Sequence, residues 1–229
     1  MPLKNRKLIV TGGPTREWLD PVRFISNPST GKMGSALAGA GFPRCGETVF
    51  IHGPVDNSLY AGKPYRSVGV ETTRDMLDAV LAELEKNCLL IMAAAPVDYA
   101  PLAVSRTKIK KEGDAISIAF KKTPDILKNV ARRAFEGIFT VGFAAETNNV
   151  EEYALGKLRD KNLDMICLND VSQSGAGFAI DTNIISIYCR DSSTLTLPML
   201  PKTEAAERIF DRIEEYVKKY LDPCLRQLG

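Results

Sequence analysis

The stretch KLIVTGGPTREWLDPVRFISNPSTGKMG, from Lys7 to Gly34, contains a strand, a long loop and the start of a helix. Its apolar run, Lys7 to Thr11, is short and followed by two glycines, as is typical of a buried strand in a parallel sheet. A helical pattern begins only at Gly31, so about twenty residues of turn formers and charged residues join the two elements. Loops of this length in a compact domain usually carry function, and ligands of α/β sheets bind beyond the carboxyl ends of the strands. The stretch therefore predicts an α/β fold with a functional loop after its first strand.

The rest of the chain alternates short apolar runs with amphipathic segments, which indicates strand-helix-strand units and a mostly parallel sheet flanked by helices. Further strands are expected at 48–52, 67–71, 89–93, 139–144 and 164–168, and helices at 31–40, 73–84, 124–134, 150–161 and 203–221. The segments Ala115 to Thr123 and Asn183 to Arg190 have strand character without a helix beside each. We therefore expect an additional antiparallel strand or flap region. No linker or repeat is visible, and we predict one domain over residues 1–229.

The composition favours a small-molecule partner. Of the 229 residues, 45% are hydrophobic and 25% charged, and 30 basic against 28 acidic side chains leave a formal charge of only +2. Such a balance gives no argument for nucleic acid or for a membrane surface. Five cysteines without C-x-x-C spacing predict a reduced, cytoplasmic protein, and His52 as the single histidine disfavours a zinc site.

The segment SNPSTGKMG, residues 26–34, looks like a phosphate-binding loop that lacks two of its features. A serine stands in place of the leading glycine, and Met33 stands where a hydroxyl would bind magnesium. An anion site is still predicted, because the first backbone N–H groups of the helix lie at the positive end of its dipole. In the alternative interpretation, Gly31 only allows close packing and Lys32 is solvated.

Other candidate groups follow the strand ends. Asn27 is either a turn former or a side-chain amide directed at a developing oxyanion. In MAAAPVDYAP, residues 92–101, the alanines either leave room for a flat ring or only pack tightly, and Asp98 could take a hydroxyl or a metal ion. The basic run at 108–111 is either a mobile phosphate-binding lid or a solvated face. Lys157 and Lys161 share one helix face, able to meet a polyanion or to pair with neighbouring glutamates.

Seven blocks of the sequence together resemble one known family. They are GGPTREWLDPVRFISNPSTGKMG, AAAPVDY, KIKK, TPDIL, VGFAAETNN, KLRDKNLDMICLNDVS and GFAIDTN. In order, from Leu8 to Asn183, these blocks are similar to phosphopantothenoylcysteine synthetase, the bacterial ligase of coenzyme A biosynthesis that is often half of a bifunctional flavoprotein. The resemblance is to the synthetase half alone and implies a Rossmann-like core, a homodimer, and a separate or fused flavin-dependent decarboxylase.

The resemblance also implies a reaction and its residues. CTP and 4′-phosphopantothenate would form an acyl-cytidylate and pyrophosphate, with Mg²⁺, and the amine of L-cysteine would then displace CMP. Asn27 would stabilise the intermediate, and Lys108 would be catalytic. Arg23 would hold either the substrate phosphate or the partner loop, and Gly31 and Lys32 would contact the substrate. The implied nucleotide contacts are Met92, Ala93, Ala94, Asp98, Lys108, Pro124, Asp125, Ile126, Leu127, Phe143, Lys157 and Lys161. The ligands of the metal are not identified.

Two other functions remain possible on the sequence. YALGK, Tyr153 to Lys157, contains the Tyr-x-x-x-Lys pair of short-chain NAD(P)-dependent oxidoreductases. That class also needs G-x-G-x-x-G after the first strand and an acidic residue at the end of the second, where His52 and Gly53 stand here. A non-catalytic nucleotide-binding module would bind its ligand without turnover.

Overall fold

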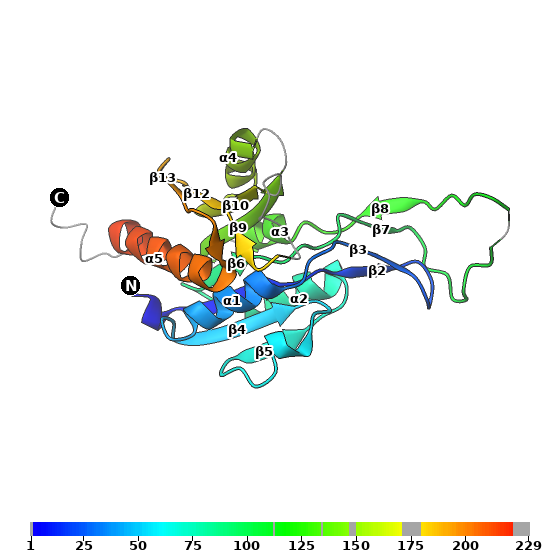
Figure 1. Ribbon diagram of the computed structural model, residues 1–229, viewed down its shortest axis with the longest axis horizontal. Coiled ribbons are helices and arrows are strands. Elements are labelled where there is room, and N and C mark those ends of the chain that lie inside the picture. The colour runs from blue at the N-terminus through cyan, green and yellow to red at the C-terminus, as the bar shows by residue number, and fades with distance from the viewer. Residues whose placement is uncertain (1, 112, 134, 147–149, 171–179, 222–229) are drawn as a thin grey trace.

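The computed structural model describes residues 2–111, 113–133, 135–146, 150–170 and 180–221. Among these residues, an eight-stranded sheet has the order β13-β12-β10-β9-β6-β1-β4-β5 (Figure 1). The strands from β10 to β5 are parallel, whereas β12 and β13 run antiparallel to their neighbours. The bounds are β1 Lys7–Gly12, β4 Glu47–His52, β5 Arg66–Gly69, β6 Leu89–Met92, β9 Phe139–Glu146, β10 Met165–Asp170, β12 Ile185–Cys189 and β13 Thr194–Thr196.

Helices cover both faces of the sheet, because successive side chains of the buried strands point to opposite sides. Leu8 and Val10 of β1 belong to the core under α1 and α5, whereas Ile9 belongs to the core under α2 and α3. A third cluster packs α4 against β9 and β10. The helices are α1 Lys32–Gly41, α2 Thr73–Glu83, α3 Ile126–Arg133, α4 Val150–Asp160 and α5 Lys202–Leu221, with short 3₁₀ turns η1 Leu3–Asn5 and η2 Asn57–Leu59.

The α/β prediction is confirmed, including an antiparallel strand within the segment 183–190, which forms β12. The prediction for 115–123 is wrong over most of its length, because only Phe120–Lys122 forms a strand, β8. This strand pairs with β7, Tyr99–Pro101, and not with the main sheet. Another small pair joins β11, Thr182–Asn183, to β14, Leu200–Pro201.

The segment after β1, expected to be a loop, contains a hairpin of β2, Arg16–Trp18, and β3, Phe24–Ser26. The rings of Trp18 and Phe24 meet edge to face with their centroids 5.1 Å apart, and the guanidinium of Arg16 lies 4.4 Å from the centre of the Phe24 ring. Aromatic and cation–π contacts of this kind stabilise a pair of strands that is too short to be stable alone.

Together, the two hairpins extend away from the sheet as an arm, comprising residues 16–26, 99–111 and 113–122 (Figure 1). The backbone N–H of Ser105 donates to the carbonyl of Leu19 at 3.0 Å, which ties one part of the arm to the other. Several large apolar side chains are exposed on the arm: Val22, Phe24, Tyr99, Leu102, Val104, Ile116 and Phe120. Exposed apolar groups in such number on one projection are typical of a surface that contacts another protein.

Helix α1 lies in direct backbone contact with β1. A Cβ added at Gly34 would lie 2.7 Å from Cα of Gly12 and 2.8 Å from the carbonyl oxygen of Thr11. Gly31, at the N-terminus of the helix, has φ of 80°, a conformation that favours glycine. These glycines bring the N-terminus of α1 close to the carboxyl end of β1.

Candidate functional site

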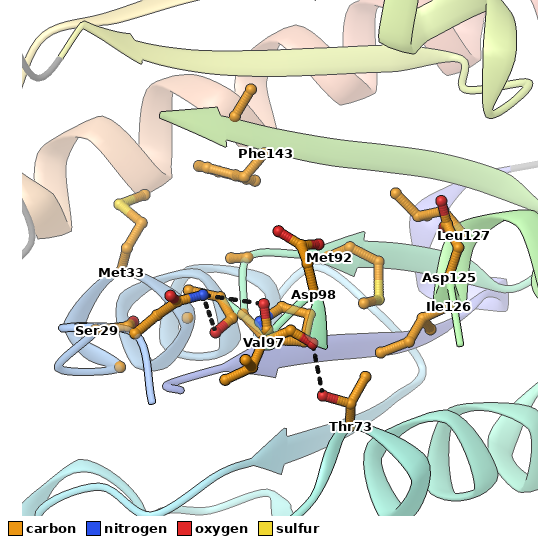
Figure 2. A pocket seen from close by; sticks show the side chains of 18 of the residues that line it. Ser29, Met33, Thr73, Met92, Val97, Asp98, Asp125, Ile126, Leu127 and Phe143 are labelled. Atoms are coloured by element: carbon orange, nitrogen blue, oxygen red, sulfur yellow. Dashed lines mark hydrogen bonds between the residues drawn. The ribbon is translucent and has the colours of Figure 1, made fainter. Parts of the chain in front are cut away.

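A pocket of about 610 Å³ lies at the carboxyl ends of β1, β6 and β9 (Figure 2). From β1 the chain continues to β4 and β5 on one side, while β6 begins the other half of the sheet on the opposite side. Loops that diverge at such a reversal of strand order leave a crevice, which is where open α/β sheets bind ligands. The pocket thus occupies the position expected for a small-molecule site.

The pocket brings together all the predicted site residues except Arg23 and Lys108. The loop before α1 and the start of that helix contribute Asn27, Gly31 and Lys32. The ends of β6 and β9 and the segments after β6, β8 and β9 contribute Met92, Ala93, Ala94, Asp98, Pro124, Asp125, Ile126, Leu127, Phe143, Lys157 and Lys161. Residues separated widely along the chain therefore share one cavity.

Asn27 joins its loop to the segment after β6. Its Nδ2 donates to the carbonyl oxygens of Ala95 and Pro96, at 3.3 and 3.0 Å. Since both amide hydrogens point at these carbonyls, the atom that Asn27 can direct at a ligand in this conformation is its acceptor, Oδ1. Donation from Asn27 to an oxyanion would require another orientation of the side chain.

Threonine hydroxyls hold the segment after β6 in place, and sequence reasoning missed them. Thr15 Oγ1 accepts from the backbone N–H of Val97 at 2.9 Å and lies 2.9 Å from Thr73 Oγ1. The carbonyl of Val97 accepts from Thr73 at 3.2 Å (Figure 2). It also accepts from Thr123, at 2.6 Å. Buried and satisfied polar contacts of this kind fix a backbone firmly. The only sign of these hydroxyl contacts in the sequence is that Thr15, Thr73 and Thr123 each stand next to a turn.

Five lysines border the pocket: Lys32, Lys122, Lys157, Lys161 and Lys202. Lys32 Nζ lies 2.5 Å from Asp181 Oδ1, and this hydrogen bond lowers the pKa of Asp181. Lys161 Nζ lies 3.3 Å from Asp125 Oδ2, so its ion-pair partner is another pocket residue and not a neighbour on α4. Five lysines around one cavity favour an anionic ligand.

Lys202 and Asn183 are pocket residues that sequence reasoning did not select. Lys202 is buried, burial lowers its pKa, and its Nζ donates to the carbonyls of Ile180 and Thr182. Asn183 is 4% exposed; its Nδ2 donates to the Met33 sulfur at 3.4 Å, while its Oδ1 has no hydrogen-bond partner. An unpaired acceptor in a pocket wall is costly unless a ligand donates to it.

Arg23 and Lys108 lie on the arm, and neither lines the pocket of this chain. Arg23 pairs with Asp20, with 2.5 Å between Nη2 and Oδ2, and Lys108 is exposed in the segment beside it. The structure therefore separates these two cations from the other predicted residues.

In the described part of the chain, no group of three or more His, Cys, Asp or Glu side chains could hold a metal ion. The carboxylates that line the pocket there are Asp98 and Asp125. Over the same residues, no helix is long and apolar enough to cross a bilayer.

The position of the pocket and its lysines define an α/β protein with a site for an anionic small molecule. Residues 3–217 match the family model for the C-terminal domain of the DNA/pantothenate metabolism flavoprotein, and the chain belongs to this family. It is 40% identical over 218 residues to the coenzyme A biosynthesis bifunctional protein CoaBC of Bacillus subtilis (strain 168), covering 95% of this chain and 53% of that protein. It is 43% identical over 214 residues to CoaBC of Escherichia coli (strain K12), covering 92% and 52%.

A solved structure shows the same fold. The C-terminal domain of a CoaBC protein superimposes with a TM-score of 0.76 at 36% identity, covering 95% of this chain and 98% of that one. The chain spans about half the length of the curated relatives it matches.

Proposed function

We propose that the chain is a phosphopantothenate–cysteine ligase of coenzyme A biosynthesis that uses CTP. The observation that carries this proposal is the pocket itself, which gathers the nucleotide contacts implied by the resemblance, Lys108 excepted, at the switch point of the sheet. The relatives named for coenzyme A biosynthesis, similar over nearly the whole chain, support the same assignment.

The proposed reaction has two displacements. A carboxylate oxygen of 4′-phosphopantothenate attacks the α-phosphorus of CTP, and pyrophosphate leaves. The amine of L-cysteine then attacks the acyl carbon, CMP leaves with the electrons of the broken bond, and the amine loses a proton. Transfer at phosphorus is catalysed mainly by positioning and charge neutralisation, which lysines and backbone N–H groups supply without a nucleophilic side chain.

The pocket offers a place for each part of the reactants. Ala93 and Ala94 leave space for a flat ring, with Phe143 on the neighbouring strand β9. The start of α1 and Lys32 suit a phosphate group, and Lys157 and Lys161 suit the triphosphate. Mg²⁺ held mainly by nucleotide phosphates needs only one or two protein carboxylates, and Asp98 and Asp125 fit that requirement. Its contribution when bound is to neutralise phosphate charge.

A homodimer that associates through the arm is part of the proposal. The exposed apolar side chains of the arm support it, since they are not covered by the described part of the chain. Lys108 lies on the same arm, so it would reach a nucleotide either by movement of its own arm or from the arm of a second copy. A flavin-dependent decarboxylase, fused or separate, would supply the next step by consuming the product, and the cytoplasm is the expected location.

The rival functions have weaker support. Tyr153 is 56% exposed and does not line the pocket that Lys157 lines, so the oxidoreductase pair is not assembled there. A binding module would leave CTP intact.

The decisive experiment measures pyrophosphate release from CTP in the presence of 4′-phosphopantothenate, and then CMP release on addition of L-cysteine. We expect both, with a higher kcat/KM for CTP than for ATP. Binding of CTP without pyrophosphate would support the module instead, and equal use of ATP would contradict the nucleotide assignment.

A further inference from the structure

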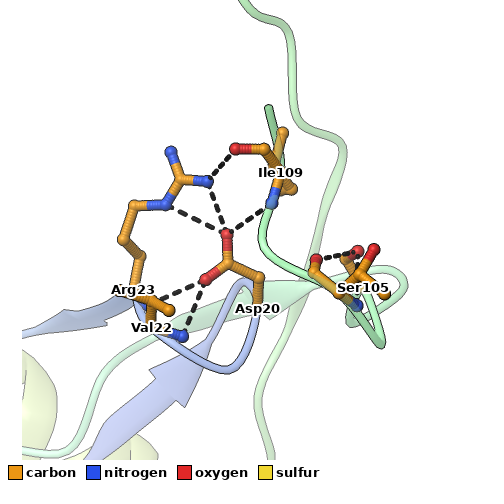
Figure 3. Close-up of polar contacts among 6 residues, drawn as sticks. Asp20, Val22, Arg23, Ser105 and Ile109 are labelled. Atoms are coloured by element: carbon orange, nitrogen blue, oxygen red, sulfur yellow. Dashed lines mark hydrogen bonds and ion pairs between the residues drawn. The ribbon is translucent and has the colours of Figure 1, made fainter. Parts of the chain in front are cut away.

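Asp20 is completely buried although it lies in the projecting arm. Its Oδ1 accepts from the backbone N–H groups of Val22 and Arg23, at 2.8 and 2.9 Å. Its Oδ2 accepts from Nε and Nη2 of Arg23, at 3.0 and 2.5 Å, and from the backbone N–H of Ile109 at 3.0 Å (Figure 3). One carboxylate therefore joins the β2–β3 turn to a segment 89 positions away.

The backbone of Ile109 is held by two hydrogen bonds, one through its N–H and one through its carbonyl. Its N–H donates to Asp20, and its carbonyl accepts from Nη2 of Arg23 at 2.7 Å. Hydrogen bonds with an ionised partner are shorter and stronger than neutral ones. Ile109 directly follows Lys108 in the chain, so the two side chains of the hairpin fix the backbone from which that lysine extends.

Asp20 is ionised at neutral pH. Burial alone would raise its pKa, but the hydrogen bonds from Ile109, Arg23 and Val22 outweigh that effect and hold the pKa well below its usual range. Both carboxylate oxygens accept N–H donors. An asparagine could not replace them, because in either orientation its own NH₂ group would face an N–H donor.

We propose that Asp20 is a positioning residue for the ligase reaction, acting through Lys108 by fixing the backbone of Ile109 against the β2–β3 hairpin. This inference rests on the proposed function. Arg23 completes the clamp, so its guanidinium contributes to the position of Lys108 as well as to the charge of the arm. Lys108 then needs no ordered contact of its own, since its place on the arm is set by the residue after it.

Asp20→Asn tests the proposal, with Asp191→Asn as the matched control. Asp191 also holds a hairpin turn, between β12 and β13, where it accepts from the backbone N–H of Ser193 at 3.0 Å and from the Tyr220 hydroxyl at 2.6 Å. It belongs neither to the pocket nor to the arm. The control thus makes the same chemical change at a turn without a catalytic neighbour.

We expect Asp20→Asn to lower kcat for pyrophosphate release on the order of tenfold to a hundredfold, because misplacing a catalytic group by about 1 Å commonly costs that much. KM for CTP should change much less, and Asp191→Asn should keep its kcat. If Asp20 acts through Lys108, adding Asp20→Asn to Lys108→Gln should cost little more, since residues that work as a unit are not additive.

Hydrogen exchange provides a readout independent of activity. In Asp20→Asn, amides of residues 105–111 should exchange faster, while those of β9 should exchange at the rate of the unsubstituted protein. Unchanged exchange at 105–111 would overturn the clamp. An unchanged kcat, or an equal loss in the Lys108→Gln background, would overturn its role in positioning. If the unsubstituted protein itself releases no pyrophosphate, the proposed function is refuted, and with it any part of Asp20 in catalysis.

Discussion

Gly34→Ala should destabilise the fold even though alanine favours helices, because the helix would be pushed off the first strand. The new Cβ would lie 2.7 Å from Cα of Gly12, about 0.7 Å closer than the shortest ordinary contact of 3.4 Å. Its neighbours there are backbone atoms of β1, which cannot turn aside as a flexible side chain could. Overpacking of this kind costs about 1–3 kcal/mol.

Gly39→Ala is the matched control on the same helix. Gly39 is exposed, and its added Cβ would meet nothing within 4 Å. The control should therefore stabilise the protein by about 0.5–1 kcal/mol, through helix propensity alone. Since Gly34→Ala gains the same propensity, the difference between the two variants isolates the packing cost.

For a chain of this size, about 1 kcal/mol shifts Tm by roughly 2–4 °C. The packing cost therefore predicts that Gly34→Ala melts about 2–12 °C below Gly39→Ala in thermal denaturation followed by circular dichroism. Urea midpoints at one protein concentration should give the same order. A Gly34→Ala protein that melts at or above Gly39→Ala would refute the close contact of α1 with β1.

Three further predictions concern the reaction and the pH dependence of stability. Lys108→Gln should lose on the order of a hundredfold in kcat at saturating CTP, as loss of one preorganised electrostatic contact commonly does, while Lys111→Gln should lose little; equal losses would mean a diffuse basic surface. Asn27→Asp should keep the fold and still release pyrophosphate but fail to ligate cysteine. A carboxylate repels the developing oxyanion, and it cannot donate to the carbonyls of Ala95 and Pro96. Normal ligation of cysteine would rule out a role for Asn27 in stabilising the intermediate. Hydrogen bonding to Arg66 lowers the pKa of Glu83, so the ionised Glu83 stabilises the fold above its unfolded-state pKa, and this stabilisation is lost as pH falls through the folded-state value. The urea midpoint of Glu83→Gln should therefore fall less on acidification than that of the unsubstituted protein. Parallel pH profiles of the two proteins would contradict this prediction.

The order of strands and helices could be predicted because each apolar run buries itself in the sheet. Ile9 and Val10 lie on opposite faces of the sheet and both are apolar, so the apolar run identifies a buried strand even when its neighbouring strands are unknown. The arm could not be predicted in this way, since β2 and β3 have three residues each and depend on the contact between Trp18 and Phe24. Short strands carry too little periodic pattern to be recognised, and their stability comes from tertiary contacts.

The pocket was predictable where residues directly follow a strand, as Ala93 and Ala94 follow β6. Lys202 was not, because it begins a helix far along the chain and enters the pocket only when α5 packs beside α1. Asp20 illustrates a different limit. Its partner Ile109 donates through the backbone, so no residue type at that position signals the contact.

The two edge strands of the main sheet restrict how copies of the chain can associate. One edge strand, β13, has three residues, and the other, β5, has four, with Arg66 pairing to Glu83 at 2.5 Å. Short edge strands present few unpaired peptide groups, and a charge such as that of Arg66 disfavours pairing further, so both edges discourage the strand-by-strand growth that leads to fibres. An apolar arm can therefore project from this sheet with a low risk of open-ended polymerisation. Concentrated solutions should accordingly contain discrete assemblies and not insoluble aggregate.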